Sequence, residues 1–156
     1  MSDSGSGSSG SSGGSGTSGT RPPTDRRALV AGHADFATGI ISAVAQIAGR
    51  PEVFLPFSNR DLSAKDVEKQ MRELVSQPNV TTMFTDLPAG SCTMAARRLL
   101  RERPDLVLVT GANLATLLEF VFSEPMTPGD TARYAVERGR TALATVEGSA
   151  EAPRGN

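Results

Sequence analysis

The stretch ALVAGHADFATGIISAVAQIAG, residues 28–49, decides how the rest of the chain is interpreted. Its apolar start ends at Gly32 and His33. Apolar residues then return at helical spacing, at Phe36, Ile40, Val44 and Ile47. The pattern predicts a strand over residues 28–31, a tight loop, and a helix that buries the apolar stripe and ends at Gly49. His33, the single histidine, therefore follows a strand and precedes a helix, where α/β proteins place functional groups.

Three similar units follow this stretch. Strands are predicted at 52–57, 80–85 and 106–110. The helices after them are predicted from Ser63, with Val67, Met71 and Leu74 buried, and over 91–103 and 114–122. Pro56 indicates that the second strand lies at a sheet edge. Four strand and helix units in series predict an α/β fold, an open doubly wound parallel sheet with helices on both faces.

The C-terminal part is predicted as a helix over 131–138, closed by Gly139, and a short strand over 141–146. Eighteen of the first 20 residues are Ser, Gly or Thr, which predicts disorder. The chain is therefore divided into a tail and linker (1–27), one domain (28–146) and a C-terminal tail (147–156), which is also expected to be disordered.

Composition excludes several classes of function. The formal net charge is −1, from 16 basic and 17 acidic residues, so neither nucleic acid nor a membrane surface is an expected partner. No run has the length of a membrane span and no signal peptide is evident, so a cytoplasmic protein is expected. One cysteine and one histidine exclude an internal disulfide and a zinc cluster, and no metal or cofactor is predicted.

Polar residues gather in the loops after the predicted strands. If the strand order is 2-1-3-4, the first and third strands are neighbours, and His33 and Asp86 face each other. A carboxylate that accepts the proton of one ring nitrogen leaves the lone pair of the other nitrogen directed outward, as a nucleophile. Gly32 and Asn113 are further candidates for lining this site.

A phosphate cradle is predicted beside this pair. The helix that opens at Ser91 presents unpaired backbone N–H groups, and Gly90 allows close approach of a ligand. Ser91 adds a hydroxyl and is expected to be the N-cap. Cys92 is interpreted as a small residue at a helix start, a position that lowers the pKa of a thiol. The chain has neither a Walker loop nor an obvious carboxylate pair for magnesium, so the pattern favours phosphoryl relay through a phosphohistidine.

Three segments together resemble a known family. AGHADFATGIISAVAQIAG, FTDLPAGS and LVTGANLATLLEFVF are similar to signature segments of the mannose-type IIA components (mannose, fructose, sorbose, N-acetylgalactosamine) of the bacterial phosphoenolpyruvate-dependent sugar phosphotransferase system. The nearest resemblance is to the N-acetylgalactosamine-type branch, and it covers residues 28–146.

The resemblance implies roles for individual residues. His33 would accept a phosphoryl group from the carrier protein HPr and pass it to a sugar-specific IIB component, which serves a IIC/IID permease. Asp86 would orient the histidine, and Gly90 and Ser91 would contact the phosphoryl group. The family fold has strand order 2-1-3-4 with a fifth, antiparallel strand exchanged within a homodimer, which would be residues 141–146.

Three positions depart from the family pattern: Ala34 and Ala89 stand where glycine is usual, and Cys92 stands where proline is usual. These changes bear on partner affinity and rate more than on the chemistry. Two other functions stay open. One is the phosphoryl-donor subunit of a dihydroxyacetone kinase, which has a similar fold and histidine, and the other is a non-catalytic paralogue that regulates a partner.

Overall fold

The computed structural model describes residues 25–149, so most of the tails predicted at 1–27 and 147–156 lies outside the described residues. Four strands form one parallel sheet: β1 (Arg27–Gly32), β2 (Phe54–Ser58), β3 (Val80–Thr85) and β4 (Val107–Thr110). Their order is β2-β1-β3-β4, so the predicted strand order is confirmed. Pro56 lies in β2 at the edge of the sheet, where the missing backbone N–H costs no ladder hydrogen bond.

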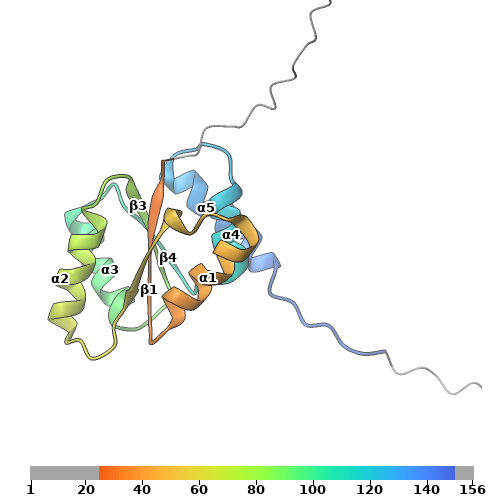
Figure 1. Cartoon of the computed structure of the whole chain (residues 1–156), viewed down its shortest axis with the longest axis horizontal. Coiled ribbons are helices and arrows are strands. Elements are labelled where there is room, and N and C mark those ends of the chain that lie inside the picture. The colour runs from red at the N-terminus through yellow and green to blue at the C-terminus, as the bar shows by residue number, and fades with distance from the viewer. Residues whose placement is uncertain (1–24, 150–156) are drawn as a thin grey trace, which may run out of the picture.

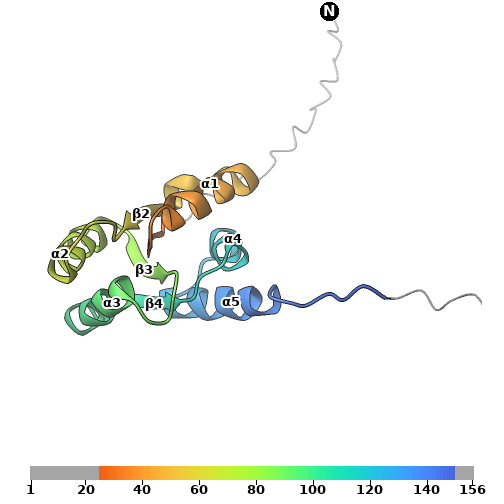
Figure 2. The ribbon, with the colours of Figure 1, turned by 90° about the horizontal axis from the view of Figure 1, so that it is seen from below.

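Helices cover both faces of the sheet, as the doubly wound fold requires (Figures 1 and 2). One face packs against α1 (Phe36–Ala48), α4 (Leu114–Phe122) and α5 (Pro128–Thr141). The opposite face packs against α2 (Ala64–Val75) and α3 (Ser91–Glu102). Parallel neighbours need crossover connections, and the change of face after β2 allows the chain to pass β1 and continue to β3.

Each face of the sheet has its own apolar core. On the α1 side, Phe84 packs edge-on against Phe120 at 5.2 Å between ring centroids, and Phe54 completes the aromatic cluster. On the α2 side, fully buried Met71 and Met83 share the core. The near-continuous burial of β1 follows from this sandwich, because both faces of the strand are covered.

The buried faces of α1 and α2 differ from the predicted faces by about one residue. α1 buries Ala37, Ile41 and Val44, whereas the predicted core residue Ile47 is 57% exposed. Phe36 and Ile40 pack only at the margin of the core. In α2, Val75 rather than Leu74 completes the buried face. The start of β2 is also later than predicted, because Pro51–Val53 form a turn of 3₁₀ helix (η1).

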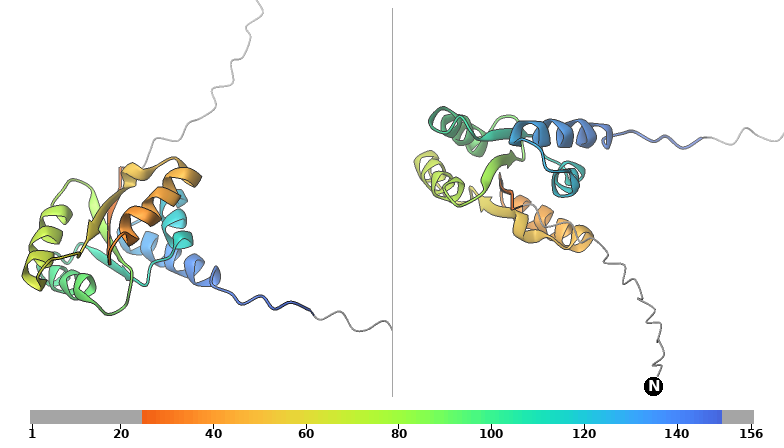
Figure 3. Two further views of the ribbon diagram at one scale, coloured as in Figure 1. Left: turned by 60° about the horizontal axis from the view of Figure 1, so that its bottom comes forward. Right: turned by 90° about the horizontal axis from the view of Figure 1, so that it is seen from above.

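The C-terminal prediction needs correction. α5 begins at Pro128, after the N-cap Thr127, and runs to Thr141, so Gly139 lies inside the helix instead of closing it. Thr141 is thus helical, and residues 142–149 form neither helix nor strand in this single chain. Figure 3 shows them running away from the sheet. Because a strand needs a partner for its backbone groups, its formation in a dimer stays a prediction.

Candidate functional site

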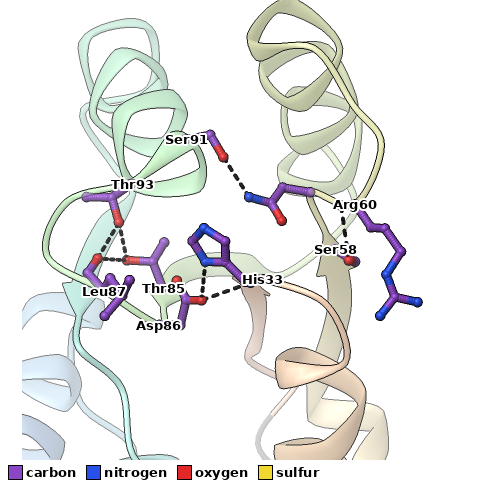
Figure 4. Close-up of polar contacts among 9 residues, drawn as sticks. His33, Ser58, Arg60, Thr85, Asp86, Leu87, Ser91 and Thr93 are labelled. Atoms are coloured by element: carbon purple, nitrogen blue, oxygen red, sulfur yellow. Dashed lines mark hydrogen bonds and ion pairs between the residues drawn. The ribbon is translucent and has the colours of Figure 1, made fainter.

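The site lies at the carboxyl ends of β1 and β3, which are neighbours in register from Ala28 with Thr82 to Ala31 with Thr85. His33 follows β1 and Asp86 follows β3, so the sheet brings their side chains together (Figure 4). The His33 backbone N–H donates to Asp86 Oδ2 at 2.8 Å, and His33 Nδ1 lies 2.7 Å from the same oxygen. Two contacts to one carboxylate oxygen therefore fix both the backbone and the ring of His33.

This geometry determines the chemistry of the ring. In the neutral imidazole, an Nδ1–H that donates to the carboxylate leaves the Nε2 lone pair free. The side chain of His33 is 53% exposed, whereas that of Asp86 is only 12% exposed. The imidazole is thus open to solvent, while the carboxylate that contacts it is shielded.

The backbone around the pair is tightly held. Asp86 N–H donates to the Ala31 carbonyl at 3.3 Å, which continues the β1–β3 ladder to the site. A side chain at Gly32 would have no room, because its Cβ would lie 2.8 Å from an Asp86 carboxylate oxygen. On the other side of the loop, Thr93 Oγ1 donates to the Leu87 carbonyl at 2.6 Å. The backbone at Asp86 is therefore held by β1 on one side and, through Leu87, by α3 on the other.

The start of α3 lies beside the histidine ring. Gly90 is the N-cap with φ of +149°, a conformation that favours glycine, and an added Cβ would lie 3.5 Å from His33 Cε1. The expectation that Ser91 is the N-cap is wrong, since Ser91 is the first helical residue. Its Oγ instead accepts a hydrogen bond from Asn59 Nδ2 at 2.8 Å. The first turn of α3 thus presents backbone N–H groups beside His33 without a side-chain cap among the described residues.

Asn113 has a structural use in these contacts. It is the N-cap of α4, and its Oδ1 accepts from Thr116 N at 2.8 Å. Its Nδ2 donates to the Gly139 carbonyl of α5 at 2.9 Å. The amide is occupied by holding α4 against α5, so these contacts give no support to a role in lining the site.

Asn59 is a site residue that the sequence analysis missed. It lies in the loop between β2 and α2. Its N–H donates to the Gly32 carbonyl at 3.1 Å, and its side chain reaches Ser91. Because β2 is also a neighbour of β1, the predicted strand order could have indicated that this loop reaches the same edge of the sheet.

Two of the positions that depart from the family pattern have physical consequences here. Cys92 is 1% exposed, and burial, with a smaller contribution from the Asp86 charge, raises the pKa of its thiol to about 11. Burial thus outweighs the lowering of a thiol pKa that a helix start favours, and Cys92 is a small, buried residue in the first turn of α3, as predicted. Ala34 has φ of +47°, in the left-handed region where glycine is favoured.

No group of three or more His, Cys, Asp or Glu residues within 25–149 is arranged to hold a metal ion. In the same part of the chain, every helix is too short or too polar to cross a membrane.

Solved structures share this fold. The mannose/sorbose-specific IIA subunit of the phosphotransferase system from Enterococcus faecalis has a TM-score of 0.71 at 20% identity, with 83% of this chain and 100% of that chain covered. A phosphotransferase system component EIIA from Streptococcus agalactiae gives 0.69 at 23% identity, with 76% and 95% covered. The PTS IIA protein associated with the fucose utilization operon from Streptococcus pneumoniae gives 0.64 at 22% identity, with 77% and 92% covered. The fold is thus that of phosphotransferase system IIA proteins.

The sequence itself assigns the family. Residues 27–133 match the family model EIIA-man, described as "PTS system fructose IIA component", and the chain belongs to this family. No curated protein matches the sequence. The chain is accordingly a IIA component of a sugar phosphotransferase system, a class of phosphotransferase that works with HPr and a IIB component. These comparisons do not distinguish the N-acetylgalactosamine-type branch from the others.

Proposed function

We propose that His33 accepts a phosphoryl group on Nε2 from phospho-HPr and passes it to a IIB component in the cytoplasm, for sugar uptake through a IIC/IID permease. One observation carries the proposal: Nδ1 lies 2.7 Å from the Asp86 carboxylate while the side chain is 53% exposed. A ring held by one nitrogen and exposed at the other is suited to covalent relay between two proteins.

In the transfer step, the Nε2 lone pair of His33 attacks the phosphorus of the donor phosphohistidine. The new P–N bond forms as the donor's P–N bond breaks, and that electron pair returns to the donor imidazole. The His33 ring then carries positive charge, which the Asp86 carboxylate stabilises through Nδ1–H. Transfer to the IIB component reverses these events. Because both donor and product are phosphohistidines, the protein contributes mainly positioning.

The start of α3 would bind the phosphoryl oxygens. Its first backbone N–H groups carry the positive end of the helix dipole, and Gly90 places them close to the ring. The Ser91 hydroxyl adds a side-chain donor at the same point. This arrangement favours transfer without a metal ion bound to this chain.

Phosphorylation tests the proposal directly. Incubation with phosphoenolpyruvate, the general phosphotransferase enzyme and HPr is expected to add one acid-labile phosphoryl mass to the wild-type chain and none to His33→Ala. Circular dichroism of both proteins controls for folding. A folded wild-type chain that takes up no phosphoryl group would contradict the proposal and favour a regulatory paralogue.

The acceptor can be identified by the same assay. The segments that resemble the N-acetylgalactosamine-type branch support a IIB component of that branch as the preferred acceptor. Phosphorylated chain is therefore expected to transfer faster to this IIB component than to one of a mannose system. Transfer to the subunits of a dihydroxyacetone kinase instead would identify the alternative function.

The proposal includes a dimer with exchanged C-terminal strands. β4 is the second edge of the sheet, and a groove of about 600 Å³ lies between it and α5, lined by Val107, Val109, Ala132 and Val136 among others. After α5, Leu143 and Val146 are 86% and 92% exposed. An open strand edge and an apolar segment without cover are complementary features, which supports pairing of residues 142–146 with β4 of a second copy.

Truncation after Thr141 is expected to convert the dimer to a monomer, because it removes this segment and leaves α5 intact. Sedimentation velocity would measure the change, with truncation after Gly148 as the matched control. An unchanged dimer after the shorter truncation would contradict strand exchange.

A further inference from the structure

Asn59 joins three segments at the site. Its N–H donates to the Gly32 carbonyl at 3.1 Å, directly before His33 in the chain. Its side-chain Nδ2 donates to Ser91 Oγ at 2.8 Å, across 32 residues of sequence. The loop after β2 thereby connects the end of β1 with the first turn of α3.

The direction of the bond to Ser91 has a chemical consequence. An amide nitrogen only donates, so the Ser91 oxygen accepts in this contact, and its proton is directed to a partner other than Asn59. The neighbouring Cys92 thiol also interacts with the Ser91 side chain, and a phosphoryl oxygen would be the stronger acceptor of this proton. Figure 4 shows the outer ring nitrogen of His33 pointing toward Ser91. A phosphoryl group on that nitrogen would present oxygens that only accept hydrogen bonds, and a serine hydroxyl directed as a donor matches them.

We infer that Asn59 is a positioning residue, which holds the Ser91 hydroxyl so that its proton is donated to the phosphoryl group on His33 Nε2. The inference rests on the proposed function. Asn59 acts on the reaction through Ser91, and its backbone bond to Gly32 keeps the amide at a fixed distance from the histidine loop.

Two substitutions separate donation from mere packing. Asn59→Ala removes the donor and is expected to slow phosphoryl transfer to His33 about fivefold. Asn59→Asp has nearly the same shape, but its carboxylate accepts the Ser91 proton and repels the phosphoryl group. It is expected to slow transfer at least about tenfold, further than alanine does.

A double-mutant cycle provides the decisive readout. In a Ser91→Ala background, Asn59→Ala is expected to cause no further loss, because its only route to the phosphoryl group has been removed. Ser63→Ala is the matched control in the same loop, since Ser63 caps α2 through Asp66 N and is expected to lower stability without changing transfer. Denaturant midpoints of every variant verify folding.

The outcomes are distinguishable. An equal loss from Asn59→Ala with and without Ser91 would overturn the inference, and so would full activity of Asn59→Ala or Asn59→Asp. A wild-type chain that never gains a phosphoryl group on His33 would overturn the proposed function and this inference together.

Discussion

The starts of α3 and α4 look alike in sequence and are used differently. Each helix follows a strand through a loop that contains glycine, and each has a small polar residue at its start, Ser91 or Asn113. At α4, the Asn113 side chain caps the helix by accepting from Thr116 N. At α3, Gly90 is the N-cap, and the Ser91 side chain bonds to Asn59 instead.

The difference indicates which helix ends are available to a ligand. α2, α4 and α5 have side-chain caps, from Ser63, Asn113 and Thr127. Among the described α-helices, α1 and α3 begin without a side-chain cap bond, and these are the two that follow His33 and Asp86 in the chain. A capped end satisfies its amides internally, whereas an uncapped end retains donors for an anion.

Cysteine reactivity tests the start of α3 most strongly. Because the Cys92 thiol is buried and its pKa is raised to about 11, its thiolate is scarce at pH 8. Alkylation by iodoacetamide is expected to be more than about 100-fold slower in the native chain than in urea. Between pH 7 and 9 the native rate should keep rising with pH and should not level off. Rapid native labelling would show that this helix start activates the thiol after all.

Asp86→Asn should have the next largest effect. The backbone N–H of His33 also donates to this position, so the variant is expected to keep an amide oxygen there, but the neutral amide no longer stabilises the positive charge on the phosphorylated ring. Phosphoryl transfer is expected to fall by about 10- to 100-fold, with the unfolding midpoint little changed. Unaltered transfer in a folded variant would contradict this role of Asp86.

Ser91→Ala and Asn113→Ala should separate rate from stability. Ser91→Ala is expected to slow transfer about tenfold and to leave stability near the wild-type value. Asn113→Ala is expected to lower the free energy of unfolding by about 1–2 kcal/mol, because the cap and the tie to α5 are lost, and to leave transfer unchanged. Rates and urea unfolding would be measured on both. A loss of stability in Ser91→Ala together with slower transfer in Asn113→Ala would contradict the different uses of the two helix starts.

Ala34→Gly should have the smallest effect. Relief of the left-handed backbone at φ of +47° is expected to outweigh the added freedom of the unfolded chain and to stabilise the protein by about 0.5 kcal/mol. Ala89→Gly is the control, because Ala89 is not among the residues with positive φ and its replacement should destabilise slightly. Equal effects in urea unfolding would refute the strain at Ala34.

Local signals were sufficient to predict most of the fold. Four strand and helix units in series leave few topologies, and the strand order then brings His33 to Asp86. The uses of Ser91 and Asn113 could not be predicted in this way. Their partners Asn59 and Gly139 lie 32 and 26 residues away, so the choice between cap and site depends on tertiary contacts.

The prediction for the C-terminal region was wrong for a related reason. Glycine is typical of a helix end, yet α5 continues through Gly139 to Thr141. The Gly139 carbonyl accepts a hydrogen bond from the Asn113 side chain. Likewise, the buried face of α1 differs from the predicted face by about one residue. The spacing of apolar residues along a helix does not reveal the orientation in which the helix packs on the sheet. Packing between elements decided these details.

The most direct test of the central claim is the site of phosphorylation on the ring of His33. Because the chain has one histidine, ¹⁵N labelling of histidine gives a single pair of ring nitrogen signals, and both belong to His33. NMR of the phosphorylated chain is expected to place the phosphoryl group on Nε2, with Nδ1 still protonated and bonded to Asp86. A phosphoryl group on Nδ1, or on neither nitrogen, would contradict the account.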